Sequence, residues 1–105
     1  MRSISPAELH EWGESGKAFV VLDVREAPER AIAALPGSLD VPMRDVPARM
    51  AELPRDRALV VLCHYGERSA RVAQFLEGNG FGDVYNLAGG IDAYSEEIDA
   101  GIPRY

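Results

Sequence analysis

Two short, unbroken apolar runs constrain the fold of this chain more than any other feature of its sequence. Residues 19–22 read F-V-V-L, and residues 58–62 read A-L-V-V-L. Neither run alternates with polar residues, and both are rich in valine, which is typical of strands. Strands without a polar face are buried on both sides, as in a parallel sheet that helices cover. The two runs therefore predict a central, mainly parallel sheet.

Helix signals separate these runs from further strand candidates. Ser5 and Glu8 form an S-x-x-E capping box with Pro6 between them, so a helix should begin there and end near Gly13 or Gly16. Further helices are expected over residues 28–34, 46–53 and 91–98, and Asp45 could cap the second of these. Another helix should follow Cys63 and extend as far as Gly78 or Gly80. Short strands are expected over residues 39–41 and 84–87. This alternation predicts an α/β fold: a three-layer domain with a mainly parallel central sheet of about 4–5 strands flanked by helices.

The length of the chain allows one folded unit. A chain of 105 residues has room for about one small domain. No internal repeat or flexible linker divides it, so we take residues 1–105 as a single domain. The longest apolar run is far below the roughly 18 residues of a membrane span, and the N-terminus lacks the apolar segment of a signal peptide. We therefore expect a cytoplasmic protein with no membrane segment.

Charge and cysteine content argue against several classes of function. The chain has 17 acidic and 11 basic residues, and a net charge of -6 opposes binding to the phosphate backbone of a nucleic acid. The single cysteine, Cys63, allows neither an internal disulfide nor a cysteine-based zinc site. The two histidines, His10 and His64, stand far apart in the sequence. We expect no metal and no cofactor, so any role of Cys63 depends on its reactivity.

The segment from Cys63 to Ser69 carries the chemistry. It reads C-H-Y-G-E-R-S and lies between a predicted buried strand and a predicted helix, at the sheet edge where ligands of α/β proteins gather. Backbone N–H groups of a tight loop and the N-terminus of the next helix both favour a thiolate. Gly66 permits close approach of the backbone, and the planar fork of Arg68 suits oxyanions. The alternative is that Cys63 packs as a small buried hydrophobe, a common use of free cysteine.

Four motifs resemble those of the rhodanese-like family, in the same order along the chain. Residues 22–26 (L-D-V-R-E) are similar to the family's L-D-V-R-E, and residues 35–42 (L-P-G-S-L-D-V-P) to its I-P-G-A-x-N-I-P. Residues 63–69 resemble the active loop C-x-x-G-x-R-S, and residues 80–90 the closing G-F-x-x-V-x-x-L-x-G-G. The resemblance covers nearly the whole chain, and the order and spacing of the motifs make it specific.

The resemblance implies a rhodanese-like fold and a sulfurtransferase. Cys63 would take a sulfane sulfur from a small donor such as thiosulfate, hold it as a persulfide and pass it to an acceptor. The other loop residues would bind the substrate: His64, Tyr65, Gly66, Glu67, Arg68 and Ser69. Asp23 and Arg25 would support the fold as an ion pair. Because the chain has no second cysteine, the acceptor must be external, such as cyanide, glutathione, reduced thioredoxin or a cysteine of a partner protein.

Other readings of this loop stay open. It could belong to a sulfur carrier or partner-binding module that holds a persulfide without rapid turnover. A small cysteine phosphatase or arsenate-type reductase would use the same nucleophile, but the spacing of Cys63 and Arg68 is C-x4-R, whereas the related phosphatases resemble C-x5-R. His64 could act as a general base, although neighbouring residues that leave a strand point in different directions, which favours substrate contact instead. The family often has Arg or Lys at this position, so His64 predicts weaker attraction of thiosulfate.

Overall fold

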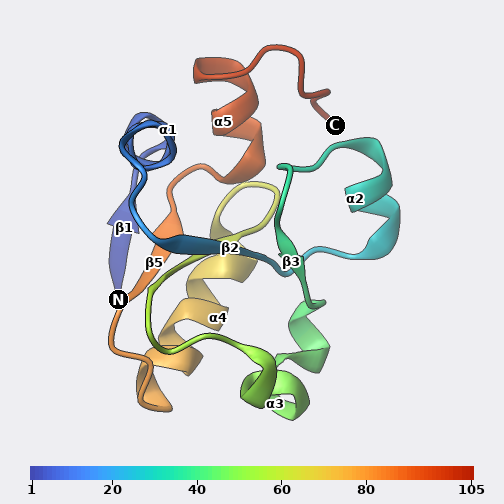
Figure 1. Ribbon diagram of the computed structural model, residues 1–105. Coiled ribbons are helices and arrows are strands. Elements are labelled where there is room, and N and C mark those ends of the chain that lie inside the picture. Colours follow the sequence, from blue (N-terminus) through green and yellow to red (C-terminus); the bar gives the residue numbers. More distant parts are fainter.

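A five-stranded sheet forms the centre of the computed structural model, which describes residues 1–105 (Figure 1). The strands are β1 (Arg2–Ile4), β2 (Phe19–Asp23), β3 (Leu39–Asp40), β4 (Ala58–Leu62) and β5 (Val84–Leu87). Their order across the sheet is β1-β5-β4-β2-β3, and all neighbouring pairs are parallel. The predicted α/β class with a parallel sheet is confirmed.

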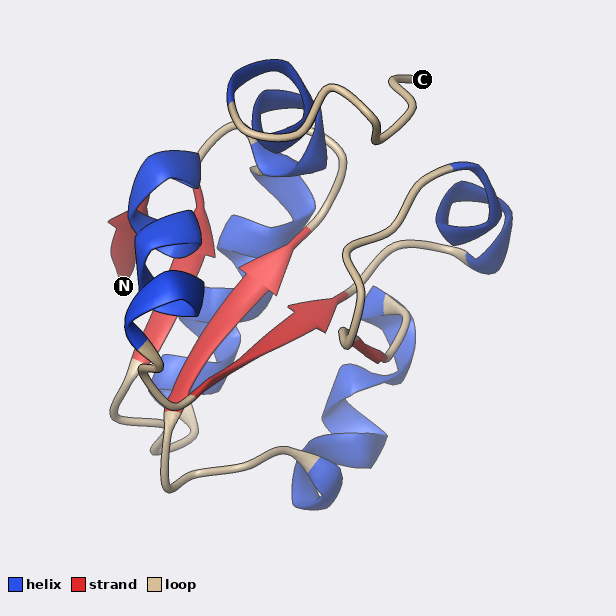
Figure 2. Ribbon diagram, turned by 45° about the horizontal axis from the view of Figure 1, so that its top comes forward, coloured by secondary structure: helices blue, strands red, loops and turns tan.

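Helices cover both faces of this sheet. They are α1 (Pro6–Ser15), α2 (Ala27–Ile32), α3 (Val46–Arg49), α4 (Glu67–Gly78) and α5 (Gly90–Glu97). Helices α1 and α5 lie on one face and α3 and α4 on the other, while α2 stands beyond the end of β2 (Figure 1, Figure 2). None of the helices combines the length and the apolar character that a membrane span would require.

The two apolar runs form β2 and β4, which are neighbours in the middle of the sheet. All five residues of β4 are buried, and they alternate between the two cores. Leu59 and Val61 pack in the core on the α4 side, whereas Val60 and Leu62 pack in the core beneath α1 and α5. Cys63 continues this alternation and belongs to the α4 side. The sulfur therefore lies at the carboxyl edge of the sheet, close to the beginning of α4.

The capping box predicted for the first helix is confirmed. The Ser5 hydroxyl accepts the N–H of Glu8 at 3.1 Å, and the Glu8 carboxylate accepts the N–H of Ser5 at 3.0 Å. Gly16 ends the helix in the left-handed region, at a φ of 76°. Local chemistry alone therefore determines both ends of α1.

Two features of the structure depart from the sequence analysis. Residues 2–4 were not recognised as a strand, because only Ile4 of the three is buried at this edge of the sheet. The helix expected over residues 46–53 is divided into α3 and a 3₁₀ turn at Met50–Glu52, and Asp45 makes no side-chain capping bond. The backbone of Asp45 is already helical, since it ends the 3₁₀ turn Met43–Asp45, and a side-chain cap requires extended backbone.

Candidate active site

Cys63 follows the last residue of β4 and is only 1% exposed. Its Sγ accepts a hydrogen bond from the N–H of Gly66 at 3.1 Å and lies 3.2 Å from the hydroxyl oxygen of Ser69. Helix α4 begins at Glu67, so the sulfur lies near the positive end of a helix. Donated N–H bonds and a helix N-terminus both stabilise negative charge at this position. The structure thus brings Cys63, Gly66 and Ser69 together around one buried sulfur.

Two glycines allow the loop to close this tightly. Gly66 has a φ of 102°, in the region that favours glycine. Gly90 approaches the loop so closely that a Cβ atom there would lie 2.3 Å from the carbonyl oxygen of His64. The N–H of Ile91 donates to the carbonyl of Cys63 at 2.9 Å, and that of Asp92 to the carbonyl of His64 at 3.1 Å. The first turn of α5 therefore supports the cysteine loop, a contact that the sequence analysis did not predict.

Asn86 is a buried polar residue of the site that the sequence analysis missed. The Ser69 hydroxyl donates to its Oδ1 at 2.5 Å, and its Nδ2 donates to the carbonyl of Gly66 at 3.1 Å. The side chain thereby ties β5 to both Ser69 and the turn before α4. One signal was available: Asn86 interrupts an otherwise apolar strand at a position that faces the core.

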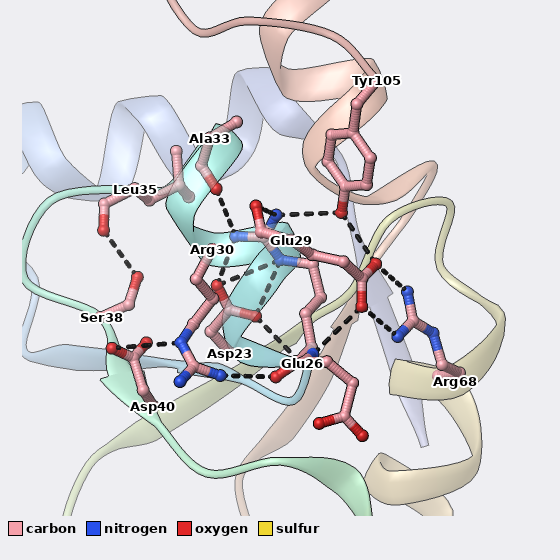
Figure 3. A network of polar contacts seen from close by, with 11 residues as sticks. Asp23, Glu26, Glu29, Arg30, Ala33, Leu35, Ser38, Asp40, Arg68 and Tyr105 are labelled. Carbon is pink, nitrogen blue, oxygen red and sulfur yellow. Dashed lines mark hydrogen bonds and ion pairs between the residues drawn. The ribbon is translucent and has the colours of Figure 1, made fainter.

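Arg68 forms a bidentate ion pair with Glu29, a residue of α2 that the sequence analysis did not single out (Figure 3). Its Nη1 and Nη2 donate to Oε2 and Oε1 of Glu29 at 2.9 and 2.7 Å. The Arg68 guanidinium lowers the pKa of Glu29 to about 2, and the carboxylate raises the pKa of Arg68 above its usual value. The cation expected to be open to oxyanions therefore already has a carboxylate partner.

Asp23 and Arg25 form a second ion pair, and both side chains are 0% exposed. Arg25 donates to the Asp23 carboxylate through Nε and Nη2, to the carbonyl of Ala33 at 2.7 Å and to the hydroxyl of Tyr105 at 3.0 Å. Burial acts to lower the pKa of Arg25, but the hydrogen bonds to Asp23 and Tyr105 outweigh it and raise this pKa. The same Tyr105 hydroxyl donates to Glu29 at 3.0 Å, so it joins the two ion pairs (Figure 3).

His64 lies between two aromatic rings instead of facing the sulfur. Its ring stacks on Tyr65 and on Tyr105, with 3.8 Å between ring centroids in each case. Its Nε2 is buried without a hydrogen-bond partner, and no hydrogen bond joins the ring to Cys63. This geometry does not support the general-base reading of His64. Glu67, by contrast, is exposed at the first position of α4.

A cavity of about 170 Å³ opens above the sulfur. It is lined by Cys63, His64, Tyr65, Glu67 and Arg68. Since a water molecule takes about 30 Å³ of liquid volume, the cavity admits a group of a few heavy atoms. The arrangement can bind a small group beside a buried sulfur and stabilise negative charge that develops there.

Comparison with known proteins identifies the family. The protein-family model of the rhodanese-like domain matches residues 5–97, so the chain belongs to the rhodanese-like family. The resemblance of the four sequence motifs is thereby confirmed.

Individual relatives support the same class. The chain is 43% identical over 89 residues to the Rhodanese-like/PpiC domain-containing protein 12, chloroplastic, of Arabidopsis thaliana, covering 81% of this chain and 30% of that protein. It is 38% identical over 84 residues to a sulfurtransferase of Allochromatium vinosum, covering 80% of this chain and 76% of that one. A crystal structure of a rhodanese-like domain protein from Staphylococcus aureus superposes with a TM-score of 0.86 at 30% identity, covering 100% and 99% of the two chains. The chain thus spans less than a third of the plant protein but most of the bacterial sulfurtransferase. The similarity to the bacterial protein supports a rhodanese-type sulfur transfer.

Proposed function

We propose that this protein is a sulfurtransferase that carries a sulfane sulfur on Cys63 between a donor and an external acceptor. The observation that carries this proposal is the surrounding of the Cys63 Sγ: the Gly66 N–H lies 3.1 Å away, α4 begins four residues after the cysteine, and a small cavity opens above the sulfur. A persulfide places its negative charge on the outer sulfur, one bond further into that cavity. The sequence similarity to a named sulfurtransferase supports the same reaction.

The transfer takes two displacement steps. The Cys63 thiolate attacks the outer sulfur of the donor, the S–S bond of the donor breaks, and the remainder leaves with the bonding electrons; for thiosulfate, this leaving group is sulfite. The acceptor then attacks the outer sulfur of the persulfide, and the Cys63 thiolate leaves. Both steps conserve electrons, so the cycle requires no oxidant, reductant or cofactor.

The residues around Cys63 differ in their proposed roles. Gly66 and the loop N–H groups stabilise the sulfur charge, Ser69 contacts the inner sulfur, and the side chains of His64, Tyr65 and Glu67 border the incoming molecule. Arg68 also lines the cavity, with its charge paired to the carboxylate of Glu29. Asp23 and Arg25 make no hydrogen bond to the sulfur of Cys63 and act by holding the segment that follows β2.

The single cysteine of the chain indicates that the sulfur acceptor is external. Cys63 is the only thiol in the sequence, so no second cysteine of this chain can resolve the persulfide. An external thiol such as glutathione or a protein cysteine, or cyanide, takes the sulfur instead. The proposal places this exchange in the cytoplasm, where such thiols are kept reduced.

Intact-protein mass spectrometry tests the proposal directly. The native chain should gain the mass of one sulfur on incubation with a sulfane donor and lose it when glutathione or cyanide is added. The Cys63→Ser variant should fold, as judged by circular dichroism, and gain nothing. Sulfur loading or turnover in Cys63→Ser would overturn the mechanism. Loading with very slow discharge to small acceptors would indicate a carrier, and hydrolysis of an aryl phosphate through Cys63 would indicate a phosphatase.

A further inference from the structure

The charge of Arg68 is not free to attract an anion. Arg68 is the one arginine or lysine among the five residues that line the cavity above Cys63. Both of its terminal amino groups donate to Glu29, so the carboxylate occupies one of the two edges through which a guanidinium binds an oxyanion. The pKa of Glu29, about 2, keeps this carboxylate charged at neutral pH. The ion pair as a whole therefore adds no net positive charge to the cavity.

Neighbouring charges do not compensate for this. Glu67 lines the cavity and adds a second carboxylate. Arg104 is held by both oxygens of Asp92, at 3.0 and 3.1 Å. Arg71, one turn further along α4, lines a separate groove beside α3. A small dianion that enters the cavity thus meets more negative than positive charge.

We propose that Glu29 determines which sulfur donor the site accepts: by masking Arg68, it favours an alkyl persulfide with an uncharged carrier group over a small sulfur dianion such as thiosulfate. This inference rests on the proposed function, since it names the donor class for the same cysteine. The Cys63 thiolate attacks the outer sulfur of R–S–SH, a new S–S bond forms, and the S–S bond of the donor breaks. The thiolate R–S⁻ leaves with the bonding electrons, and the outer sulfur stays on Cys63 with its proton.

Glutamine at position 29 tests the negative charge of this side chain separately from its role at the start of α2. The Glu29 carboxylate also accepts the N–H of Glu26 at 3.1 Å, as the third-position residue of the α2 capping box, and accepts the Tyr105 hydroxyl. The two bonds go to different oxygens of Glu29, and the single side-chain oxygen of glutamine can keep the one from the Glu26 N–H, because glutamine serves in capping boxes as glutamate does. Glu29→Gln therefore removes the negative charge while keeping the helix start.

Glu26→Gln is the matched control. Glu26 lies at the start of the same helix, and its replacement removes the same charge, but its carboxylate forms an ion pair with Arg44 and none with Arg68. Any effect of net charge alone would appear equally in both variants. An effect of unmasking Arg68 would appear only in Glu29→Gln.

The experiment measures the rate at which Cys63 gains one sulfur, by intact-protein mass, with thiosulfate and with 2-hydroxyethyl persulfide as donors. Cys63→Ser serves as the blank. Native protein and Glu26→Gln should load faster from the persulfide. Glu29→Gln should load from thiosulfate about tenfold faster than the native protein, near the lower end of charge-steering effects, with little change for the persulfide. Added salt should speed thiosulfate loading of the native protein more than that of Glu29→Gln, because the variant lacks the excess negative side-chain charge that repels the dianion.

The outcomes distinguish the inference from the function on which it rests. If the native protein loads equally well from both donors and Glu29→Gln changes nothing, the masking role is wrong and the sulfurtransferase proposal stands. If Glu26→Gln accelerates thiosulfate loading as much as Glu29→Gln does, net charge and not Arg68 is responsible, which also overturns the masking role. If neither donor loads Cys63, both proposals fail.

Discussion

Two arginine–carboxylate pairs of this molecule, Arg25–Asp23 and Arg68–Glu29, are both bidentate but have very different surroundings. Arg25 and Asp23 are two residues apart and 0% exposed. Arg68 and Glu29 are 39 residues apart in sequence, and their side chains remain 33% and 20% exposed beside the cavity. A fully buried charge cannot lose its partner without a large cost, whereas a partly exposed one can exchange it for water or a ligand. Burial, more than the ion pair itself, therefore separates a structural arginine from one that can respond to substrate.

The Tyr105 hydroxyl connects these two pairs in series. It accepts a hydrogen bond from Arg25 and donates one to Glu29, which in turn accepts from Arg68. Burial raises the pKa of Tyr105 above its usual value, so the hydroxyl keeps the proton that it donates.

Arg25→Met should produce the largest loss of stability. It leaves the Asp23 carboxylate buried without its main partner, and removal of one member of a buried pair costs about 3–5 kcal/mol. Urea unfolding followed by circular dichroism measures this free energy. The double variant Asp23→Leu/Arg25→Met should recover a large part of it, because two apolar side chains leave no charge unpaired. A loss below about 1 kcal/mol in Arg25→Met would remove the contrast drawn between the two arginines.

Acid titration should reveal how much the partly exposed Arg68–Glu29 pair contributes to the free energy of unfolding. Since the pKa of Glu29 falls from 4.5 to about 2 on folding, its stabilising contribution is complete above pH 4.5 and is lost as the pH falls toward 2. The shift corresponds to at most about 3 kcal/mol of unfolding free energy. Urea unfolding at a series of pH values through this window provides the measurement.

Arg68→Met is the reference for that titration. Three further carboxylates, Glu52, Asp56 and Asp92, also have lowered pKa values and lose stability in the same direction. Without Arg68, Glu29 should titrate near its ordinary pKa, so the difference between native and Arg68→Met stability should shrink from pH 5 to pH 2. A difference that stays constant over this range would contradict the lowered pKa of Glu29.

The fold could be predicted because its signals are local and redundant. The apolar runs at residues 19–22 and 58–62 predicted the two central strands, and the capping box at Ser5 predicted α1. Strand β1 was missed because an edge strand of three residues with one buried side chain leaves almost no pattern. The extent of α3 was predicted wrongly because its local signals are weak: its start is determined by the preceding turn and not by a capping side chain.

The site was predictable only where its residues are contiguous. Cys63, Gly66 and Ser69 meet through one loop, so their spacing predicted their association. Glu29 and Asn86 come from other elements, 39 and 17 residues away from their partners Arg68 and Ser69. Nothing in the local pattern of α2 shows that its third residue also reaches an arginine at the cavity. Contacts of this kind depend on the packing of whole elements, which one sequence does not reveal.

Tyr105→Phe should have the smallest effect, and it tests whether the two pairs act as one unit. The variant removes one hydroxyl but leaves its ring stacked on His64 and leaves Arg25 a 3.4 Å contact with the carbonyl of Glu29. Two hydrogen bonds to charged groups are lost, but Arg25 and Glu29 keep their other partners, so the expected loss is about 1.5 kcal/mol by urea unfolding, the lower end for a bond to a charged group. Tyr65→Phe is the matched control, because that ring also stacks on His64 while its hydroxyl makes no hydrogen bond, so it should change stability by less than about 0.5 kcal/mol. If Tyr105→Phe costs as much as Arg25→Met, the hydroxyl holds both pairs in place, and the exposed arginine shares the structural role of the buried one.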